Sequence, residues 1–141
     1  MALSVYTGGT FDLLHSGHIN FLRRCHDIAG VKGTVTVALN TDEFIYQYKN
    51  KQPILNYQER CDVLEACRYV TAVIPNSGGA DSKPTIDKCK PDVIAIGSDW
   101  ARKDYYAQMQ FHQDWLDERN ISLIYIPYTK GISTTQIKTR I

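Results

Sequence analysis

The stretch YTGGTFDLLHSGH, from Tyr6 to His18, restricts the fold of this chain more than any other segment. The residues before it, Leu3 to Tyr6, form a short run typical of a β-strand. After it, apolar side chains recur at helical spacing from about Ser16 to Ala29. The stretch is therefore predicted to connect a strand to a helix. Its adjacent glycines, Gly8 and Gly9, allow the backbone to turn tightly and to approach a ligand closely.

This connection has the properties of a phosphate-binding turn. The first N–H groups of a helix have no partner within the helix and lie at the positive end of its dipole, so they attract anions. His15 and His18 stand three residues apart, with Ser16 and Gly17 between them, and Gly17 leaves space for a bulky anion. Both imidazoles are therefore expected to reach one phosphate group.

The rest of the chain alternates predicted strands and helices. Strands are expected at Thr34–Leu39, Val70–Pro75, Val93–Ile96 and Ser122–Ile126; helices are expected up to Tyr48, from Asn56 past Arg68, at Thr85–Cys89, at Lys103–Arg119 and after Ser133. This alternation predicts one α/β domain over residues 1–141, with a Rossmann-like, doubly wound sheet of about five parallel strands. Right-handed crossovers would bring the turns after the first, second and fourth strands to one edge.

Composition excludes several classes of function. The chain has 141 residues, 43% of them hydrophobic and 22% charged, and a net charge of +1, so neither nucleic acid nor an anionic membrane is an expected partner. Apolar runs are strand-sized, and the N-terminus has no basic region followed by an apolar segment, so we expect a cytoplasmic protein without a membrane span or signal peptide. The four cysteines have no zinc-binding spacing and are expected to be reduced thiols.

The motif GTFDLLHSGH, Gly9 to His18, closely resembles the GTFDLLHxGH signature of the cytidylyltransferase-like branch of the nucleotidyltransferase superfamily. Further segments resemble bacterial glycerol-3-phosphate cytidylyltransferases: Thr41–Phe44, Arg60, Arg68–Val70, Gly97–Trp100 and Gly131–Thr135. The resemblance implies the HxGH nucleotidyltransferase fold. It also implies a reaction in which CTP and glycerol 3-phosphate, or another small phosphorylated alcohol, give CDP-glycerol, or the corresponding product, and pyrophosphate.

The resemblance also implies roles for particular residues. Both histidines would contact the triphosphate, and Lys49 or Lys51, from a polar loop after the second strand, would close over the site as a cationic lid. The residues expected to bind the nucleotide are Gly9, Thr10, Phe11, Asp12, Gly97, Asp99, Trp100, Ile132, Ser133, Thr134 and Thr135. Ser133 to Thr135 would hold the β- and γ-phosphates, and Asp99 and Trp100 the cytosine and ribose. No strong base is needed, because a phosphomonoester is already a nucleophile.

Several assignments remain alternatives. Asp12 would orient a histidine or help to place Mg²⁺, or it would only cap the turn. Trp100 would contact the base or pack, and Arg60 would reach the substrates from its helix. Arg68 would lie either at the contact of a homodimer or in the active site. Mg²⁺ is expected to accompany CTP, because no cluster of carboxylates suggests a dedicated protein site.

The sequence departs from the family pattern at one position. The family usually has Arg-Thr before the GIST element, and this chain has Tyr128-Thr129. A phosphate-clamping arginine is therefore missing, and Lys130 is expected to replace it as a point charge, because residues two apart on an extended segment face the same side.

Two other functions compete with the cytidylyltransferase hypothesis. Adenylyltransferases of the same fold, of the FAD synthetase or heptose-phosphate type, share HxGH and a Ser/Thr-rich C-terminal element. The forms GISTT and GSDW of this chain favour cytidine instead. A non-catalytic nucleotide-binding regulator is the second alternative, against which the intact His15 and His18 argue.

Overall fold

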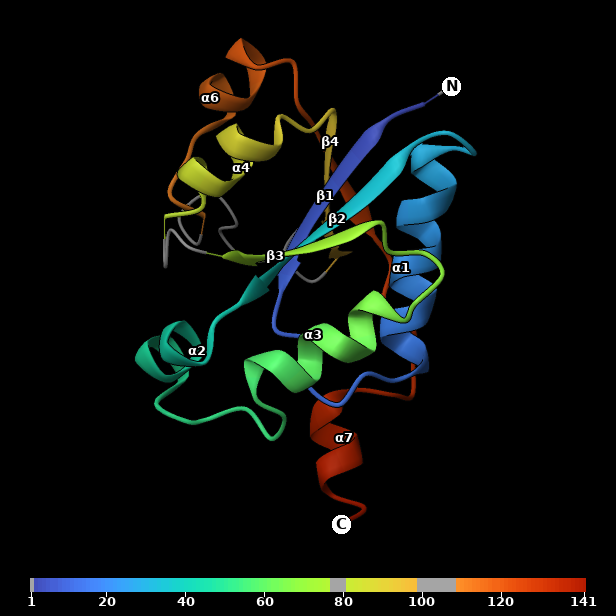
Figure 1. Cartoon of the computed structure of the whole chain (residues 1–141), viewed down its shortest axis with the longest axis vertical. Coiled ribbons are helices and arrows are strands. Elements are labelled where there is room, and N and C mark those ends of the chain that lie inside the picture. Colours follow the sequence, from blue (N-terminus) through green and yellow to red (C-terminus); the bar gives the residue numbers. More distant parts are fainter. Residues whose placement is uncertain (1, 77–80, 99–108) are drawn as a thin grey trace.

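Five parallel strands form one sheet, in the order β3-β2-β1-β4-β5. The computed structural model describes residues 2–76, 81–98 and 109–141 (Figure 1). The strands are β1 (Ser4–Gly9), β2 (Thr34–Asn40), β3 (Ala72–Asn76), β4 (Val93–Gly97) and β5 (Ser122–Ile126). The predicted doubly wound α/β sheet is therefore confirmed. All carboxyl ends of the strands lie at one edge, and ligands of open α/β sheets bind at that edge.

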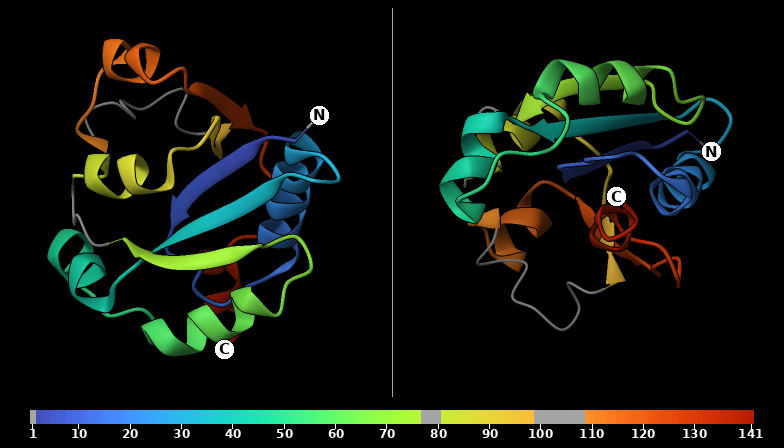
Figure 2. Two further views of the ribbon diagram at one scale, coloured as in Figure 1. Left: turned by 45° about the horizontal axis from the view of Figure 1, so that its top comes forward. Right: turned by 90° about the horizontal axis from the view of Figure 1, so that it is seen from below.

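Helices connect the strands and cover the sheet. They are α1 (Ser16–Ala29), α2 (Asp42–Lys49), α3 (Tyr57–Glu65), α4 (Lys83–Cys89), α6 (Gln113–Glu118) and α7 (Thr134–Lys138). In Figures 1 and 2, α4 and α6 lie side by side, on the opposite side of the molecule from α1. No helix in the described ranges is long and apolar enough to cross a membrane.

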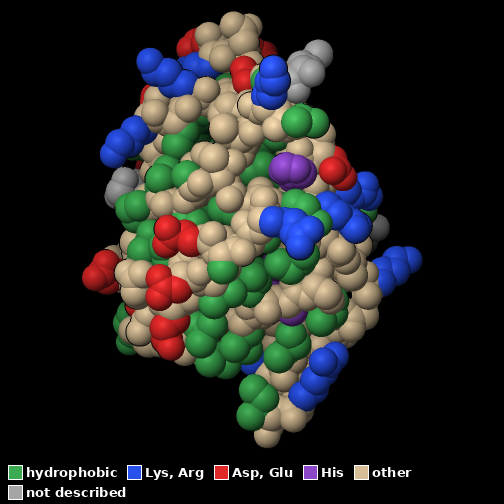
Figure 3. All heavy atoms as spheres, turned by 45° about the vertical axis from the view of Figure 1, so that its right-hand side comes forward, with side chains coloured by type: hydrophobic (Ala, Val, Ile, Leu, Met, Phe, Trp, Pro, Cys, Tyr) green, Lys and Arg blue, Asp and Glu red, His purple; other side chains and the backbone are tan. Residues whose placement is uncertain are grey.

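Alternating residues of the strands supply the core. Val5 of β1 packs in a cluster with Cys25 and Ala29 of α1, whereas the next residue, Tyr6, packs with Ile86 of α4 and Leu116 of α6. This is the two-sided burial expected of a parallel sheet with helices on both faces. On the face shown in Figure 3, several Lys and Arg side chains lie close together near a histidine, with hydrophobic and acidic side chains around them.

Two predicted helices differ from the structure. The first part of the predicted helix Lys103–Arg119, up to residue 108, lies outside the described residues. In the described part, α6 begins only at Gln113. A continuous helix is wrong here because Gln110 has a φ of +60° and His112 is extended. Helix α3 ends at Glu65, so Arg68 lies beyond it.

The apolar residues after Asn56 predict that Val63, Leu64 and Cys67 face the sheet. Leu64 is buried and Cys67 packs partly buried against the same cluster, but the prediction is wrong for Val63, which is 42% exposed. The buried apolar residues of α3 itself are Cys61 and Leu64. These two residues are three apart and therefore share one face of the helix. They pack against Val37 and Leu39 of β2.

Candidate active site

An open cleft of about 790 Å³ lies at the carboxyl ends of the strands. One half of its lining comes from the turn between β1 and α1, from Gly97 at the end of β4, and from residues 127–134 and Gln136. The other half comes from the ends of β2 and β3, with Phe44 of α2 and Ser82 before α4. We call these the histidine half and the amide half.

The backbone of the turn is shaped by its own side chains. Phe11 and Leu13 have φ values of +50° and +52°, in the left-handed region that non-glycine residues rarely occupy. A Cβ on Gly9 would lie 2.9 Å from the ring of Phe11, so this position has no space for a side chain. The Phe11 ring in turn lies 5.3 Å from that of His18, measured between centroids.

The two histidines are held by local hydrogen bonds in one tautomer. His15 is the N-cap of α1, and its Nδ1 accepts a hydrogen bond of 3.0 Å from the Gly17 N–H. His18 Nδ1 accepts one of 3.2 Å from the His15 N–H. Because each Nδ1 is an acceptor, the hydrogen of each neutral ring is on Nε2. The rings stack with centroids 3.8 Å apart, and both residues line the cleft.

Gly17 is required by this stack. A Cβ at position 17 would lie 2.8 Å from Cε1 of His15 and 3.3 Å from Cγ2 of Ile132. A larger residue would therefore displace the ring of His15 or separate α1 from the segment before α7.

Both imidazoles are neutral at pH 7. Burial lowers the pKa of His18 to about 4; a charge on His15 would lower it further, while the charge of Asp12 raises it. Burial also lowers the pKa of His15. The site thus offers two uncharged N–H donors at the N-terminus of α1, an arrangement suited to hydrogen bonding with an anion.

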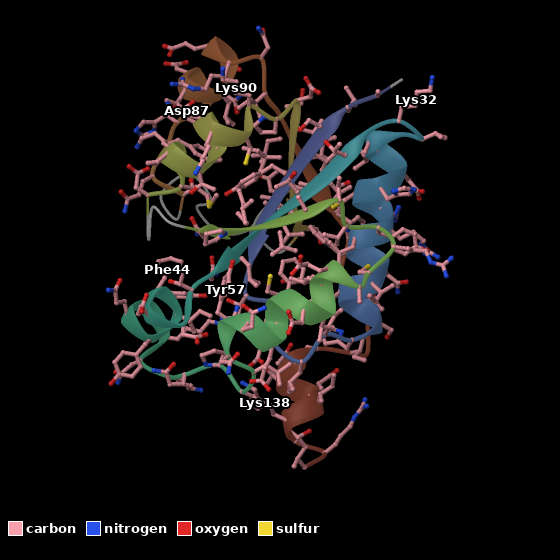
Figure 4. All side chains as sticks on the ribbon, in the orientation of Figure 1. Lys32, Phe44, Tyr57, Asp87, Lys90 and Lys138 are labelled. Carbon is pink, nitrogen blue, oxygen red and sulfur yellow. The ribbon has the colours of Figure 1, made fainter. Side chains whose placement is uncertain are left out.

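Asp12 holds neighbouring backbone. Its two carboxylate oxygens accept hydrogen bonds of 2.8 and 2.9 Å from the N–H groups of Ile54 and Leu55. Its carbonyl oxygen accepts a bond of 2.9 Å from the Thr134 hydroxyl, and the Lys138 ammonium lies 4.0 Å from Oδ2. Figure 4 shows Lys138 between α7 and α3. Asp12 therefore joins the first turn to the loop before α3 and to α7, and its carboxylate is not part of the cleft lining.

The start of α7 and the residues just before it bring three of the predicted nucleotide-binding residues to the cleft, namely Ile132, Ser133 and Thr134. Ser133 is the N-cap of α7, and its Oγ accepts a bond from the Gln136 N–H. A hydroxyl that accepts one bond still has a hydrogen to donate. Thr135 is exposed and is not in the lining, whereas Gln136, which the sequence reasoning missed, is.

The sequence predicted that Arg60 reaches the substrates from its helix, but the structure buries it among protein groups. Its side chain is fully buried and donates to protein groups: to the carbonyls of Leu55, Thr10 and Asn40 at 2.9–3.0 Å, and to Oδ1 of Asp42 at 2.6 Å. A buried guanidinium requires such partners. Arg60 is therefore a positioning residue that fixes the ends of β1 and β2.

The remaining predicted residues are divided between the cleft and its surroundings. Gly97, Tyr128 and Lys130 line the cleft. Lys49 and Lys51 are exposed and are not in the lining, and Arg68 is exposed beyond α3. Asp99 and Trp100 lie outside the described residues.

The two asparagines of the amide half were missed by the sequence reasoning. Asn40 and Asn76 are the last residues of β2 and β3 and lie opposite each other in the sheet. Asn76 Nδ2 donates to Asn40 Oδ1 at 3.0 Å, and Asn40 Nδ2 donates to the Thr10 hydroxyl at 3.2 Å. That hydroxyl is 3.2 Å from the hydroxyl of Tyr48. The available signal was a polar residue at the end of each of two adjacent apolar strands.

Among the described residues, no group of three or more His, Cys, Asp or Glu side chains is arranged to hold a metal ion. The described lining of the cleft also includes no Asp or Glu. These residues therefore do not form an oxygen-rich site of the kind that Mg²⁺ prefers.

Residues 6–140 match the cytidylyltransferase-like family, so the chain belongs to this family and is a nucleotidyltransferase. It is 40% identical over 134 residues to glycerol-3-phosphate cytidylyltransferase of Staphylococcus aureus, a match that covers 95% of this chain and 91% of the relative. The protein of the same name from Bacillus subtilis is 39% identical over 137 residues, with 97% and 95% covered.

One further relative is named as a different enzyme, and one solved structure supports the fold alone. FAD synthase of Pyrococcus abyssi is 39% identical over 97 residues, covering 69% of this chain and 64% of the relative. A solved structure, described as a lipopolysaccharide core biosynthesis protein from Thermoplasma volcanium, superposes with a TM-score of 0.71 at 24% identity. That match covers 94% of this chain and 100% of the other, and it supports the Rossmann-like fold.

Proposed function

We propose that this nucleotidyltransferase transfers CMP from CTP to a small phosphorylated alcohol, with glycerol 3-phosphate as the first candidate. The observation that carries the proposal is the pair of stacked, neutral histidines at the N-terminus of α1. The names of the relatives from S. aureus and B. subtilis support the choice of nucleotide and acceptor.

In the proposed reaction, a phosphate oxygen of the acceptor forms a bond to the α-phosphorus of CTP. The bond between the α-phosphorus and the bridging oxygen breaks, and pyrophosphate leaves with the electron pair. The enzyme must align the two anions and stabilise the charge that develops on the leaving group. The Nε2–H groups of His15 and His18 would donate to that charge, a role supported by the hydrogen bonds that occupy each Nδ1.

Other residues of the histidine half would bind the triphosphate. The Ser133 hydroxyl has a hydrogen to donate toward it, and Lys130, in the cleft lining, replaces the arginine that Tyr128 does not provide. Lys49 and Lys51, exposed at the end of α2 and just after it, would approach when substrates bind. Mg²⁺ would enter with CTP and neutralise part of the triphosphate charge. Arg68 is exposed and would contact a second copy of the chain.

Transfer of AMP to a flavin nucleotide is the second candidate function. It is favoured by the FAD synthase of P. abyssi, which aligns at 39% identity over 69% of this chain. The two functions require different nucleotides, so one assay separates them.

The test is a screen of CTP, ATP and GTP against glycerol 3-phosphate, phosphocholine, phosphoethanolamine and FMN, with detection of released pyrophosphate. We expect CTP with glycerol 3-phosphate to have a kcat/KM at least about a hundredfold above that of any purine nucleotide, because buried polar groups left unpaired penalise the wrong base. A higher kcat/KM for ATP with FMN would contradict the proposal and support the second candidate.

A further inference from the structure

The amide half of the cleft contains a buried acceptor without a partner. Asn76 is 8% exposed and lines the cleft, and its Oδ1 makes no hydrogen bond within the described part of the chain. Its Nδ2, by contrast, donates to Asn40. A buried amide oxygen without a donor costs free energy in the empty site, and a ligand that supplies the donor recovers it.

The Asn76 amide is part of a chain of hydrogen bonds. In the structure Asn76 Nδ2 donates to Asn40, and Asn40 Nδ2 donates to the Thr10 hydroxyl, which leaves Oδ1 of Asn76 at the end of the chain. Arg60 Nη1 donates 2.9 Å bonds to the carbonyls of both Thr10 and Asn40 and so fixes the backbone under the chain. Such a supported group is prepared for a ligand before the ligand arrives.

The amide half lies where the acceptor has to bind if the nucleotide occupies the histidine half. Thr10, Asn40 and Asn76 follow or end β1, β2 and β3, which are adjacent in the sheet. Gly97 ends β4 and the segment before α7 follows β5, and these two strands lie on the other side of β1 in the sheet. The ring of Phe44, labelled in Figure 4, lines the amide half and provides an apolar wall for a carbon chain.

We infer that Asn76, oriented by Asn40, accepts a hydrogen bond from a hydroxyl of the acceptor's carbon chain and so selects a phosphorylated polyol over a phosphorylated amino alcohol. This inference rests on the proposed function. A hydroxyl has the hydrogen that Oδ1 lacks, whereas a quaternary ammonium has none. A primary ammonium has hydrogens, but the described lining has no Asp or Glu to balance its charge.

The first experiment uses the unaltered chain with CTP and compares glycerol 3-phosphate with propyl phosphate, which has the same carbon chain without hydroxyls. We expect kcat/KM for glycerol 3-phosphate to be at least about a hundredfold higher, since a site that hydrogen-bonds a hydroxyl strongly disfavours the analogue without it. Phosphoethanolamine and phosphocholine should also be poor acceptors. A preference for either amino alcohol, or equal use of propyl phosphate, overturns the inference.

The second experiment changes the side chain. Asn76→Leu should lower kcat/KM for glycerol 3-phosphate about ten- to a hundredfold, the usual effect of losing a hydrogen bond to a buried polar group. Its kcat/KM for propyl phosphate should fall less than that for glycerol 3-phosphate, because propyl phosphate has no hydroxyl to donate to Oδ1. Asn76→Asp should raise kcat/KM for phosphoethanolamine about tenfold, since a carboxylate makes a charge-assisted bond to an ammonium.

The matched control is Gln58→Leu, which removes an exposed amide on α3, outside the cleft lining. It should leave the ratio of glycerol 3-phosphate to propyl phosphate unchanged. If Asn76→Leu keeps the parental ratio, the inference fails while the proposed function stands. If CTP releases no pyrophosphate with any phosphorylated alcohol, the proposed function fails and the inference fails with it. The first experiment needs no variant, so a poorly folding Asn76→Leu does not prevent the test.

Discussion

The two halves of the cleft are built in different ways. In the histidine half, the hydrogen bonds that orient the rings join residues two and three positions apart. In the amide half, the bonds join residues 30 and 36 positions apart, and a buried arginine supports them from 20 and 50 positions away. One half is thus a local motif and the other a product of the sheet order. The first can be recognised in a sequence, whereas the second exists only in the folded chain.

Arg60→Leu should have the largest effect on stability, because the amide half depends on this residue. The variant removes the donor of the Thr10 and Asn40 carbonyls, whereas Asp42, which is 34% exposed, keeps its bond from the Tyr57 N–H. Leaving a buried carbonyl without a donor costs about 1–3 kcal/mol, so the two carbonyls together should cost about 2–6 kcal/mol of unfolding free energy. Denaturant unfolding measures this loss. Arg24→Leu, an exposed position on α1, is the control and should change the free energy by about 0.5 kcal/mol or less. A loss below about 1 kcal/mol in Arg60→Leu would show that the amide half does not need this support.

Substitutions in the histidine half should instead lower the turnover rate and leave stability nearly unchanged. His15→Ala and His18→Ala should each lower kcat about a hundred- to a thousandfold, as removal of one transition-state donor does, with little change in thermal unfolding. His26→Ala, on the same helix and outside the cleft lining, is the control and should keep the parental kcat. Steady-state pyrophosphate release measures the effect. If His15→Ala and His18→Ala both kept the parental kcat, the prediction that the histidine half acts in turnover would be wrong.

A smaller effect concerns pH, because histidines titrate and amides do not. The pKa of His18 is lowered to about 4 in the folded chain, below the ordinary 6.5 that applies when unfolded. The unfolded state therefore binds the proton first as pH falls, so the stability present above 6.5 is lost between 6.5 and 4. At about 1.4 kcal/mol per pKa unit, this loss is at most about 3 kcal/mol.

His18→Gln tests this pH dependence. Glutamine at this position of a capping box can still accept from the N-cap N–H, but it does not titrate. We expect the variant to lose less unfolding free energy than the parent between pH 6.5 and 4, whereas a parallel decline would exclude His18 as a source. Asn76→Leu should keep the parental slope.

The parts that sequence reasoning predicted are those whose contacts are local. The strand–turn–helix unit, its two histidines and the capped helix α7 depend on side chains bonded to backbone within three residues. The role of Arg60 was not predictable in this way, because its carbonyl partners at Thr10 and Asn40 come from other elements. A cationic residue near a phosphate site can bind the substrate when its side chain is exposed to the cleft. When the side chain is buried, as in Arg60, it instead supports the protein backbone.

The boundaries and buried faces of helices were predicted less well, because they too depend on contacts between different elements. Val63 and Leu64 are both apolar, and the sequence does not say which one faces the sheet; the packing of α3 on β2 buries Leu64. The left-handed backbone at Gln110, before α6, could not be predicted from the sequence, because the position is not a glycine. Both features follow from tertiary contacts, which outweigh local preference.

The contacts of Asp12 have a consequence for the order in which a growing chain can complete its site. Its carbonyl is bonded by the hydroxyl of Thr134, 122 positions later in the sequence. During synthesis on the ribosome, β1, α1 and the two histidines emerge early, but the turn between them receives this last bond only after α7 begins to appear. A nascent chain therefore holds the histidine motif long before it holds a finished nucleotide cleft, and a chain stopped before residue 134 would lack the contact that closes the turn.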